Sequence, residues 1–212
     1  MLPLKEWIWP TRTIQTSSNG LASGRNSRSG VFRQRFFREN LKLGDGGETG
    51  RDNRMLEETF ERTGVSIMGK RMFDGGERFW PEEAPFHTPV FVLTHQVRKP
   101  WEPPHGTTFY FVNASIESAL GQARKAAGNK DIRIAGGANV IQQHLNAGLI
   151  DEFTIHYSPV FFGHASPLFS GISKGINVKI KEAVASKDVT HVTFEVERNG
   201  GMGTRSWSWN ER

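Results

Sequence analysis

Two adjacent glycines, Gly136 and Gly137, separate a predicted strand at residues 131–135 from a predicted helix at 138–147. A helix that begins directly after two glycines has several backbone N–H groups without intrahelical partners. These donors and the positive end of the helix dipole favour an anion, commonly phosphate. The glycine pair alone is compatible with a phosphate site and equally with a tight strand-to-helix turn without a ligand. The complete G-x-G-x-x-G pattern of dinucleotide sites is absent.

The pattern around this unit predicts strands that alternate with helices. Apolar and β-branched runs indicate strands at 65–68, 89–94, 108–112 and 153–162. Helices are expected after Asp52, which can cap a helix to about residue 62, and after Ser115. Gly148 is expected in a left-handed conformation after the helix that follows the glycine pair. Two antiparallel strands are expected at 176–185 and 189–198.

The predicted fold class is α/β. The alternation favours a three-layer α/β/α sandwich with a mostly parallel central sheet and a C-terminal antiparallel hairpin. Residues 1–11 are interpreted as an N-terminal extension, 12–198 as the domain, and 199–212 as a flexible tail. Within the domain, 12–17 is a possible first strand, 31–38 a short helix and 42–51 a mobile loop. A second loop, which contains Gly75 and Gly76, is expected after the strand at 65–68.

Composition limits the classes of function. The chain has 212 residues and no cysteine, which excludes disulfides, a thiolate nucleophile and a cysteine zinc site. No apolar run is long enough to span a membrane and no signal peptide is evident, so we expect a cytoplasmic protein without a membrane partner. The net charge of +5 suits phosphorylated small molecules, and its dispersal argues against a nucleic-acid partner. His87 and His105 are too far apart to suggest a metal site, and no metal is expected.

Three segments in this order resemble the dihydrofolate reductase-like superfamily: VSIMGKRMF at 65–73, PVFVLTH at 89–95 and IAGGANVIQQHLNAGLIDE at 134–152. The similarity is closest to the C-terminal reductase domain family of riboflavin biosynthesis and its uncharacterised relatives. It covers roughly residues 12–198.

The resemblance implies that the domain binds NADPH. Gly136 and Gly137, with the amides of Ala138, Asn139 and Val140, would hold the pyrophosphate. Residues at the ends of two further strands would complete the cofactor site: Gly69, Lys70, Arg71, Thr94 and His95. Among these, Gly69 would let the backbone approach the cofactor, and the others would supply positive charge or contact the adenosine 2′-phosphate. Ligands of open α/β sheets bind at such carboxyl ends. His144 and His156 are expected to be packing or surface residues.

The sequence departs from the family at the first strand. The family usually carries Ser-x-Asp-Gly there, facing the nicotinamide and the substrate, whereas this chain has Asn19 and Gly20 at the corresponding positions. An amide cannot act as a general acid or base at neutral pH, although Asn19 can orient a substrate ring. The alternative source of a carboxylate is the following loop, with Asp45, Glu48 or Asp52; each is otherwise a solvated loop charge.

The resemblance implies an NADPH-dependent reductase of a small heterocyclic substrate, acting on a CH–OH or CH–NH group. The first expectation is a 5-amino-6-(5-phosphoribosylamino)uracil reductase of riboflavin biosynthesis. The alternatives are a dihydrofolate or pterin reductase and a catalytically inactive nucleotide-binding protein, the latter because of Asn19. A homodimer is expected through the hairpin at 176–198, whose alternating apolar residues need cover.

Overall fold

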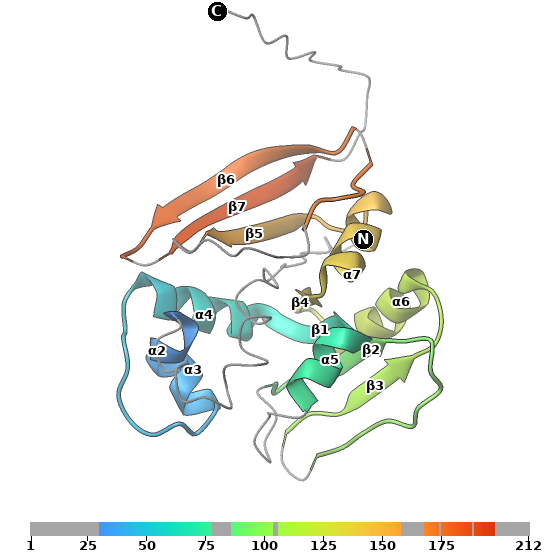
Figure 1. The fold of residues 1–212 in the computed structure, drawn as a ribbon, viewed down its shortest axis with the longest axis horizontal. Coiled ribbons are helices and arrows are strands. Elements are labelled where there is room, and N and C mark those ends of the chain that lie inside the picture. The colour runs from blue at the N-terminus through green and yellow to red at the C-terminus, as the bar shows by residue number, and fades with distance from the viewer. Residues whose placement is uncertain are drawn as a thin grey trace, which may run out of the picture.

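The computed structural model describes residues 30–77, 86–103, 106–157, 168–173, 175–187 and 189–197. The predicted strand at 12–17 and the residues Asn19, Gly20 and His105 lie outside these ranges. Figure 1 shows two sheets, with the three-stranded one drawn above the four-stranded one.

The larger sheet is parallel and has the order β3-β2-β1-β4. Its strands are β1 (Thr63–Gly69), β2 (Val90–Leu93), β3 (Phe109–Val112) and β4 (Asp131–Gly136). The inner strand β1 is buried along almost its whole length because helices cover both faces.

Opposite faces of the parallel sheet pack on different helices. Val65 and Ile67 join a core with α6 (Ile116–Ala127) and α7 (Ala138–Asn146). On the other face, Met68 packs with Phe73 of α5 (Lys70–Glu77), and α4 (Arg51–Arg62) also covers this face through Phe60, whose ring lies 5.5 Å from the Arg133 guanidinium of β4. The predicted three-layer α/β/α arrangement is therefore confirmed.

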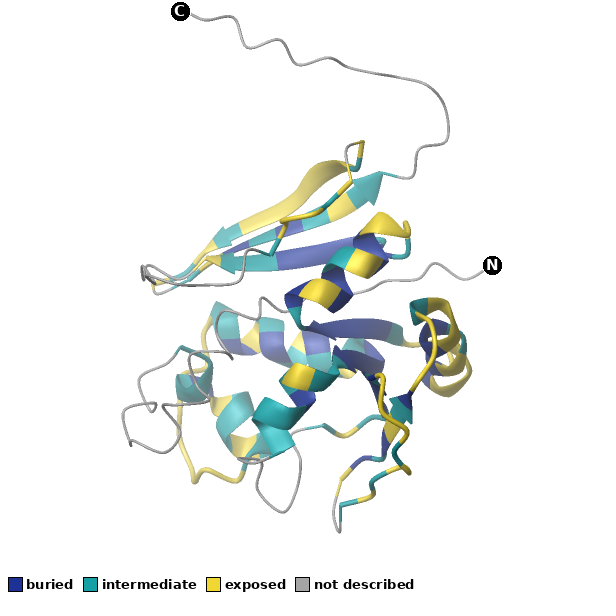
Figure 2. Cartoon of the chain, turned by 45° about the vertical axis from the view of Figure 1, so that its right-hand side comes forward, coloured by how far each residue is buried: buried dark blue, intermediate teal, exposed yellow. Residues whose placement is uncertain are grey.

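The second sheet is antiparallel, with the order β5-β7-β6. Its strands are β5 (Glu152–Tyr157), β6 (Asn177–Ala185) and β7 (Thr190–Glu197). This confirms the C-terminal hairpin and adds that β5, expected to run to residue 162, pairs with the hairpin. The face bearing Phe153 and Phe194 packs towards the α6–α7 core, whereas the opposite face carries the buried polar residues Thr154 and Thr193. Figure 2 shows the dark band of buried residues along β5.

Local sequence signals explain several element ends. The Ser115 hydroxyl accepts a hydrogen bond from Ser118 N–H at 3.3 Å, as expected for the N-cap of α6. Gly148 has φ 65°, the left-handed conformation expected after α7.

Three local expectations were wrong. The loop expected around Gly75 and Gly76 is the helix α5. The helix predicted at 31–38 is two short pieces, α2 (Gly30–Arg33) and α3 (Arg35–Asn40), separated by Gln34, which bridges to Glu48. Asp52 lies in the first turn of α4, whose N-cap is Gly50.

Along the described ranges, no helix is both long and apolar enough to cross a membrane.

Candidate cofactor edge and a neighbouring polar cluster

The predicted phosphate-binding residues meet at one edge of the parallel sheet. In the strand register, Gly69 lies opposite Leu93, and Met68 lies opposite Gly136. The carboxyl ends of β1, β2 and β4 are therefore level, and the residues that follow them share one edge. This is the position at which open α/β sheets bind their ligands.

The glycine pair at this edge has the geometry that a close ligand requires. Gly136 is buried with φ 134°, in the left-handed region that favours glycine. A Cβ added to Gly137 would have no heavy atom within 4 Å, so the backbone there borders open space. Directly after it, α7 presents the first-turn amides of Ala138, Asn139 and Val140, and glycine at the N-cap offers no side chain to satisfy them.

Gly69 has a packing role at the same edge. A Cβ at this position would lie 3.0 Å from Val140 Cγ2 and 3.9 Å from the Gly136 carbonyl oxygen. The absence of a side chain therefore lets β1 approach the start of α7, in addition to any approach to a cofactor.

The charged residues after β1 are divided between an ion pair and solvent. The Lys70 ammonium donates to the Asp74 carboxylate at 2.5 Å, one turn further along α5. Arg71 is exposed. Beyond β2, Thr94 is buried and its hydroxyl accepts from Gln96 N–H at 3.0 Å, whereas His95 is exposed. Arg71 and His95 are thus the most exposed of the polar side chains predicted to contact the cofactor at this edge.

A cluster that the sequence did not predict lies between α4 and the antiparallel sheet. His156 of β5 and His191 of β7 are paired across the strands, and their Nδ1 atoms are in hydrogen-bonding contact. His191 Nε2 donates to Asp52 Oδ1 at 3.1 Å, and the Ser186 hydroxyl lies 2.9 Å from Asp52 Oδ2. His156, expected to be a packing or surface residue, is therefore part of a polar network. His144 is buried and packs within α7 as expected, with Nδ1 2.7 Å from the Val140 carbonyl oxygen.

Of the three loop carboxylates considered from the sequence, only Asp52 reaches this cluster. Glu48 instead pairs with Arg33 at 3.4 Å and accepts from the Gln34 amide at 3.2 Å. Asp45 is exposed. The position of Asp52 on a helix facing β7 distinguishes it from a solvated loop charge.

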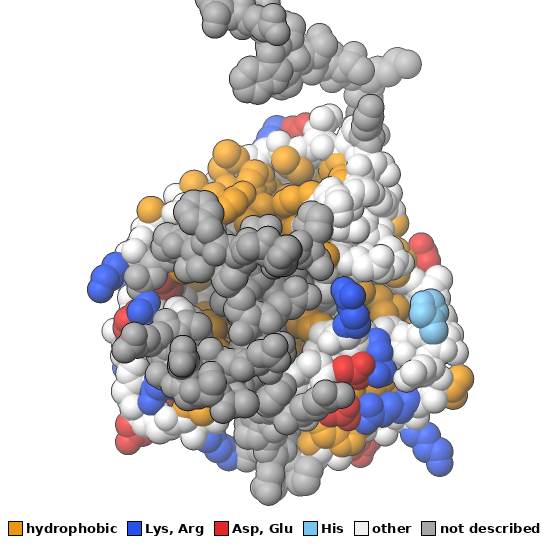
Figure 3. Space-filling model, in the orientation of Figure 1, with side chains coloured by type: hydrophobic (Ala, Val, Ile, Leu, Met, Phe, Trp, Pro, Cys, Tyr) orange, Lys and Arg blue, Asp and Glu red, His pale blue; other side chains and the backbone are white. Residues whose placement is uncertain are grey.

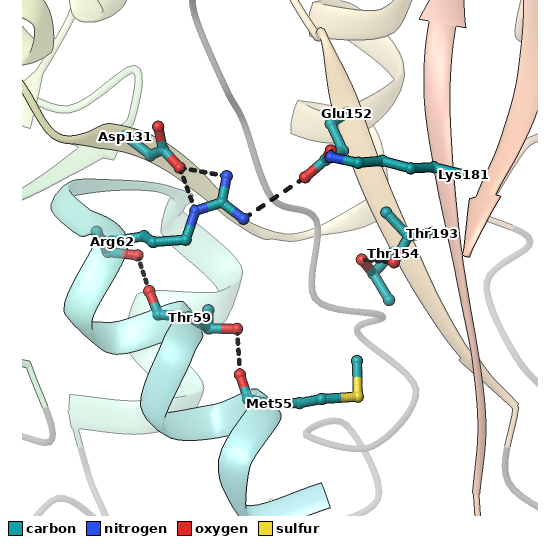
Figure 4. A network of polar contacts seen from close by, with 9 residues as sticks. Met55, Thr59, Arg62, Asp131, Glu152, Thr154, Lys181 and Thr193 are labelled. Carbon is teal, nitrogen blue, oxygen red and sulfur yellow. Dashed lines mark hydrogen bonds and ion pairs between the residues drawn. The ribbon is translucent and has the colours of Figure 1, made fainter. Parts of the chain in front are cut away.

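A second ion-pair network joins the two sheets at the C-terminal end of α4. Arg62, at the end of α4, binds Asp131 of β4 at 2.6 Å and lies 3.7 Å from Glu152 of β5. Glu152 is also paired with Lys181 of β6. Figure 4 shows the Arg62 guanidinium between the two carboxylates, with Thr154 and Thr193 close by at 2.9 Å from each other.

A cavity of about 360 Å³ lies at the other end of the parallel sheet. Its lining includes Thr63, which opens β1, and Thr88, which precedes β2, so it is at the amino end of these strands. Arg133 contributes to the lining, and burial lowers its pKa to about 9. This cavity is distinct from the edge that carries Gly136 and Gly137. Within the described ranges, no cluster of three His, Cys, Asp or Glu residues could hold a metal ion.

Comparison with known proteins connects this geometry to a family. Residues 22–192 match the RibD C-terminal domain. The uncharacterized protein YyaP of Bacillus subtilis (strain 168) is 39% identical over 70 residues, which are 33% of this chain and 37% of that protein. The match therefore covers well under two thirds of this curated relative.

Solved structures share the fold at low sequence identity. A protein from Shewanella sp. PV-4, provisionally assigned to riboflavin biosynthesis, has a TM-score of 0.59 and 22% identity, covering 76% of this chain and 88% of its own. A diaminohydroxyphosphoribosylaminopyrimidine deaminase/5-amino-6-(5-phosphoribosylamino)uracil reductase from Thermotoga maritima has a TM-score of 0.50 and 16% identity. That match covers 73% of this chain and 51% of the Thermotoga protein. At these identities the likeness establishes the fold.

Proposed function

Because the chain belongs to the RibD C-terminal domain family, with its dihydrofolate reductase-like fold, we propose that it is an NADPH-dependent reductase of a small heterocyclic substrate. The observation that carries this proposal is the shared edge formed by Gly69, Thr94 and the Gly136–Gly137 pair. The open space beside Gly137 and the first-turn amides of α7 suit a pyrophosphate.

The same edge supports NADPH over NADH. Arg71 and His95 are exposed side chains that follow β1 and β2, so both can approach a 2′-phosphate. Lys70 lies at the same edge, and its pairing with Asp74 reduces the charge it offers to a ligand. A nicotinamide cofactor, when bound, supplies the hydride; the residues of this chain position it and neutralise its phosphates.

The proposed substrate is 5-amino-6-(5-phosphoribosylamino)uracil, by analogy with the reductase named for the Thermotoga structure. Asn19, in place of the family aspartate, does not prevent hydride transfer, which depends chiefly on the cofactor and on positioning. Of the three loop carboxylates considered from the sequence, Asp52 is the one that is half-buried and paired with a histidine, His191.

Cofactor binding and turnover are tested separately. Fluorescence titration should show NADPH binding about tenfold or more tighter than NADH, since a charge-assisted phosphate contact contributes roughly 1.5–3 kcal/mol. NADPH oxidation should then occur with 5-amino-6-(5-phosphoribosylamino)uracil and be slower with dihydrofolate. Equal affinity for the two cofactors would refute the 2′-phosphate site, and faster turnover of dihydrofolate would replace the proposed substrate with a pterin.

A further inference from the structure

The cavity of about 360 Å³ at the amino end of the parallel sheet has a polar floor. Ser66 of β1 and Arg133 of β4 are partners in the strand register, and both line the cavity. They are only 1% and 5% exposed, so the floor is shielded from bulk water. Two neighbouring strands therefore bring a hydroxyl and a guanidinium together beneath one enclosed space.

Both floor residues can donate hydrogen bonds to a ligand. Within the part of the chain that the structure describes, the Ser66 hydroxyl makes no hydrogen bond, although this serine is almost fully buried. A buried hydroxyl without a partner is unfavourable, and an acceptor atom in the cavity would relieve this cost. Burial lowers the pKa of Arg133 to about 9, which leaves the guanidinium a cation at pH 7, and its five N–H groups can serve more than one acceptor. A cation beside a hydroxyl donor suits a carboxylate.

Aromatic side chains form walls above this floor. Phe36 of α3, Phe60 of α4 and Phe86 line the cavity. The rings of Phe36 and Phe60 meet edge to face with centroids 5.1 Å apart, and the Arg133 guanidinium lies 5.5 Å from the Phe60 ring centre. The cationic floor and the aromatic wall are therefore contiguous. A flat apolar group that carries a carboxylate matches this combination.

Two carboxylates of α4, those of Glu57 and Glu61, also line the cavity. They are one helical turn apart, on the side of α4 that carries Phe60. Glu57 is half-buried, and its Oε1 accepts from the Asn53 amide at 2.8 Å. A ligand with negative charge alone would be repelled by these carboxylates, and one with positive charge alone would be repelled by Arg133. A molecule that carries both charges satisfies the floor and the wall together.

We propose that this cavity binds an aromatic α-amino acid, at a site separate from the proposed cofactor edge. The ligand carboxylate accepts from Ser66 and Arg133, its ammonium donates to Glu57, and its ring packs against the aromatic walls. These contacts give the buried hydroxyl an acceptor and pair charges of both signs in a largely enclosed space. The inference does not depend on reductase activity, because the cavity lies at the opposite end of the strands from Gly136 and Gly137.

Calorimetric titration of the full chain with three related compounds tests the class of ligand. L-Phenylalanine carries both charged groups, 3-phenylpropanoate lacks the ammonium and 2-phenylethylamine lacks the carboxylate. L-Phenylalanine should bind with a dissociation constant of about 1 mM or lower. Each analogue should bind at least about tenfold more weakly, since each loses a charge-assisted contact. The proposal is overturned if L-phenylalanine shows no saturable binding or if either analogue binds as tightly.

Ser66→Ala tests the place of binding. It removes only the hydroxyl, and the fold should be retained because no hydrogen bond within the described chain is lost. The affinity for L-phenylalanine should fall by about tenfold, the usual effect of one hydrogen bond to a charged group. The matched control is Ser118→Ala, an exposed serine on α6, which packs on the other face of the sheet. Unchanged affinity in Ser66→Ala would place the ligand elsewhere and overturn the proposal.

Glu57→Gln tests the ammonium contact separately. Glutamine keeps an oxygen for the Asn53 amide and removes the charge. This variant should bind L-phenylalanine about tenfold more weakly and should not lose affinity for 3-phenylpropanoate, which has no ammonium. Glu58→Gln is the control, because Glu58 is exposed, pairs with Arg51 at 3.6 Å and is absent from the cavity lining. An equal loss for both compounds in Glu57→Gln would contradict the proposed contact.

Discussion

Gly137 is the residue on which the proposed phosphate site depends most directly. Replacement by aspartate places a carboxylate in the space that a pyrophosphate would occupy. Two like charges 4 Å apart repel by about 4 kcal/mol at an effective dielectric constant of 20. We expect Gly137→Asp to weaken NADPH binding by at least about a hundredfold, measured by fluorescence titration of the folded variant.

Gly137→Ala is the matched control. Its Cβ would meet no protein atom within 4 Å, so the variant should fold, as circular dichroism can establish. It should lose less affinity than the aspartate variant because it adds bulk without charge. An aspartate variant that binds NADPH as tightly as the parent would place the phosphate site elsewhere.

At the same scale, the sequence indicated some candidate site residues and did not indicate others. Gly136 and Gly137 were identifiable because a strand, two glycines and a helix are contiguous in the chain. The contact between His156 and His191 was not, because it depends on the antiparallel register of two distant strands. Asp52 could be recognised in the sequence as a candidate carboxylate, but its contact with His191 of β7 could be found only from the fold.

Helix α4 is held to both sheets by Arg62. Its guanidinium reaches Asp131 and Glu152, whose side chains are 15% and 5% exposed. We expect Arg62→Met to lower the free energy of unfolding by about 1–3 kcal/mol, because two largely buried carboxylates lose a charged donor. Urea denaturation measures this difference.

An exposed ion pair provides the comparison for Arg62. Lys179 and Glu197 lie 2.7 Å apart on neighbouring strands, with side chains 70% and 36% exposed. Lys179→Met should therefore cost no more than about 1 kcal/mol. Equal losses in the two variants would show that Arg62 does not fasten α4 to the sheets.

Elements with clear end signals were predictable, whereas tertiary packing decided the others. Ser115 and Gly148 marked their helices correctly. The sequence of α5 contains Gly75 and Gly76, which are poor helix formers, and the helix is nevertheless present because Phe73 packs in the core beneath it.

For the whole molecule, the C-terminal sheet presents an apolar surface. Val178 and Ile180 of β6 are 41% and 67% exposed, and β6 is an edge strand. Figure 3 shows hydrophobic side chains gathered over the upper part of the molecule, where Figure 1 draws this sheet. We propose that a second copy of the chain covers this surface, since an apolar edge strand needs protection.

Ile180→Lys tests this dimer. Light scattering at micromolar concentration should give a dimer for the parent and a monomer for the variant. Val97→Lys changes another exposed apolar residue, 91% exposed and outside the sheet, and should leave the dimer intact. A monomeric parent protein would remove the proposal.

Acid should destabilise the folded protein through its buried histidines. Burial lowers the pKa of both His144 and His156, in the latter case to about 3. The unfolded chain therefore binds more protons below its ordinary histidine pKa of about 6.5, and stability is lost as the pH falls below that value. For a group such as His156, we expect a loss of about 2 kcal/mol between pH 7 and pH 5.

The acid effect can be assigned by substitution. His144→Gln should reduce the difference between the unfolding free energies at pH 7 and pH 5, because burial lowers the pKa of His144. His87→Gln, which replaces an exposed histidine, is the control. Parallel urea titrations at the two pH values measure both. A difference that is the same in the His144 variant and the parent would contradict this assignment.

The register of β1 also has a consequence for how the chain folds. Thr63 pairs with Asp131, so α5, β2, β3 and α6 must all be synthesised before β1 acquires its second neighbour. The β6–β7 hairpin, in contrast, closes locally around the turn where Ser186 N–H donates to the Val189 carbonyl oxygen at 2.8 Å. Early order should therefore arise in the hairpin, and parallel pairing should limit the rate because distant closure costs chain entropy first. Since each doubling of a loop adds only about 0.6 kcal/mol, insertions between β1 and β4 should slow folding more than they weaken the finished protein.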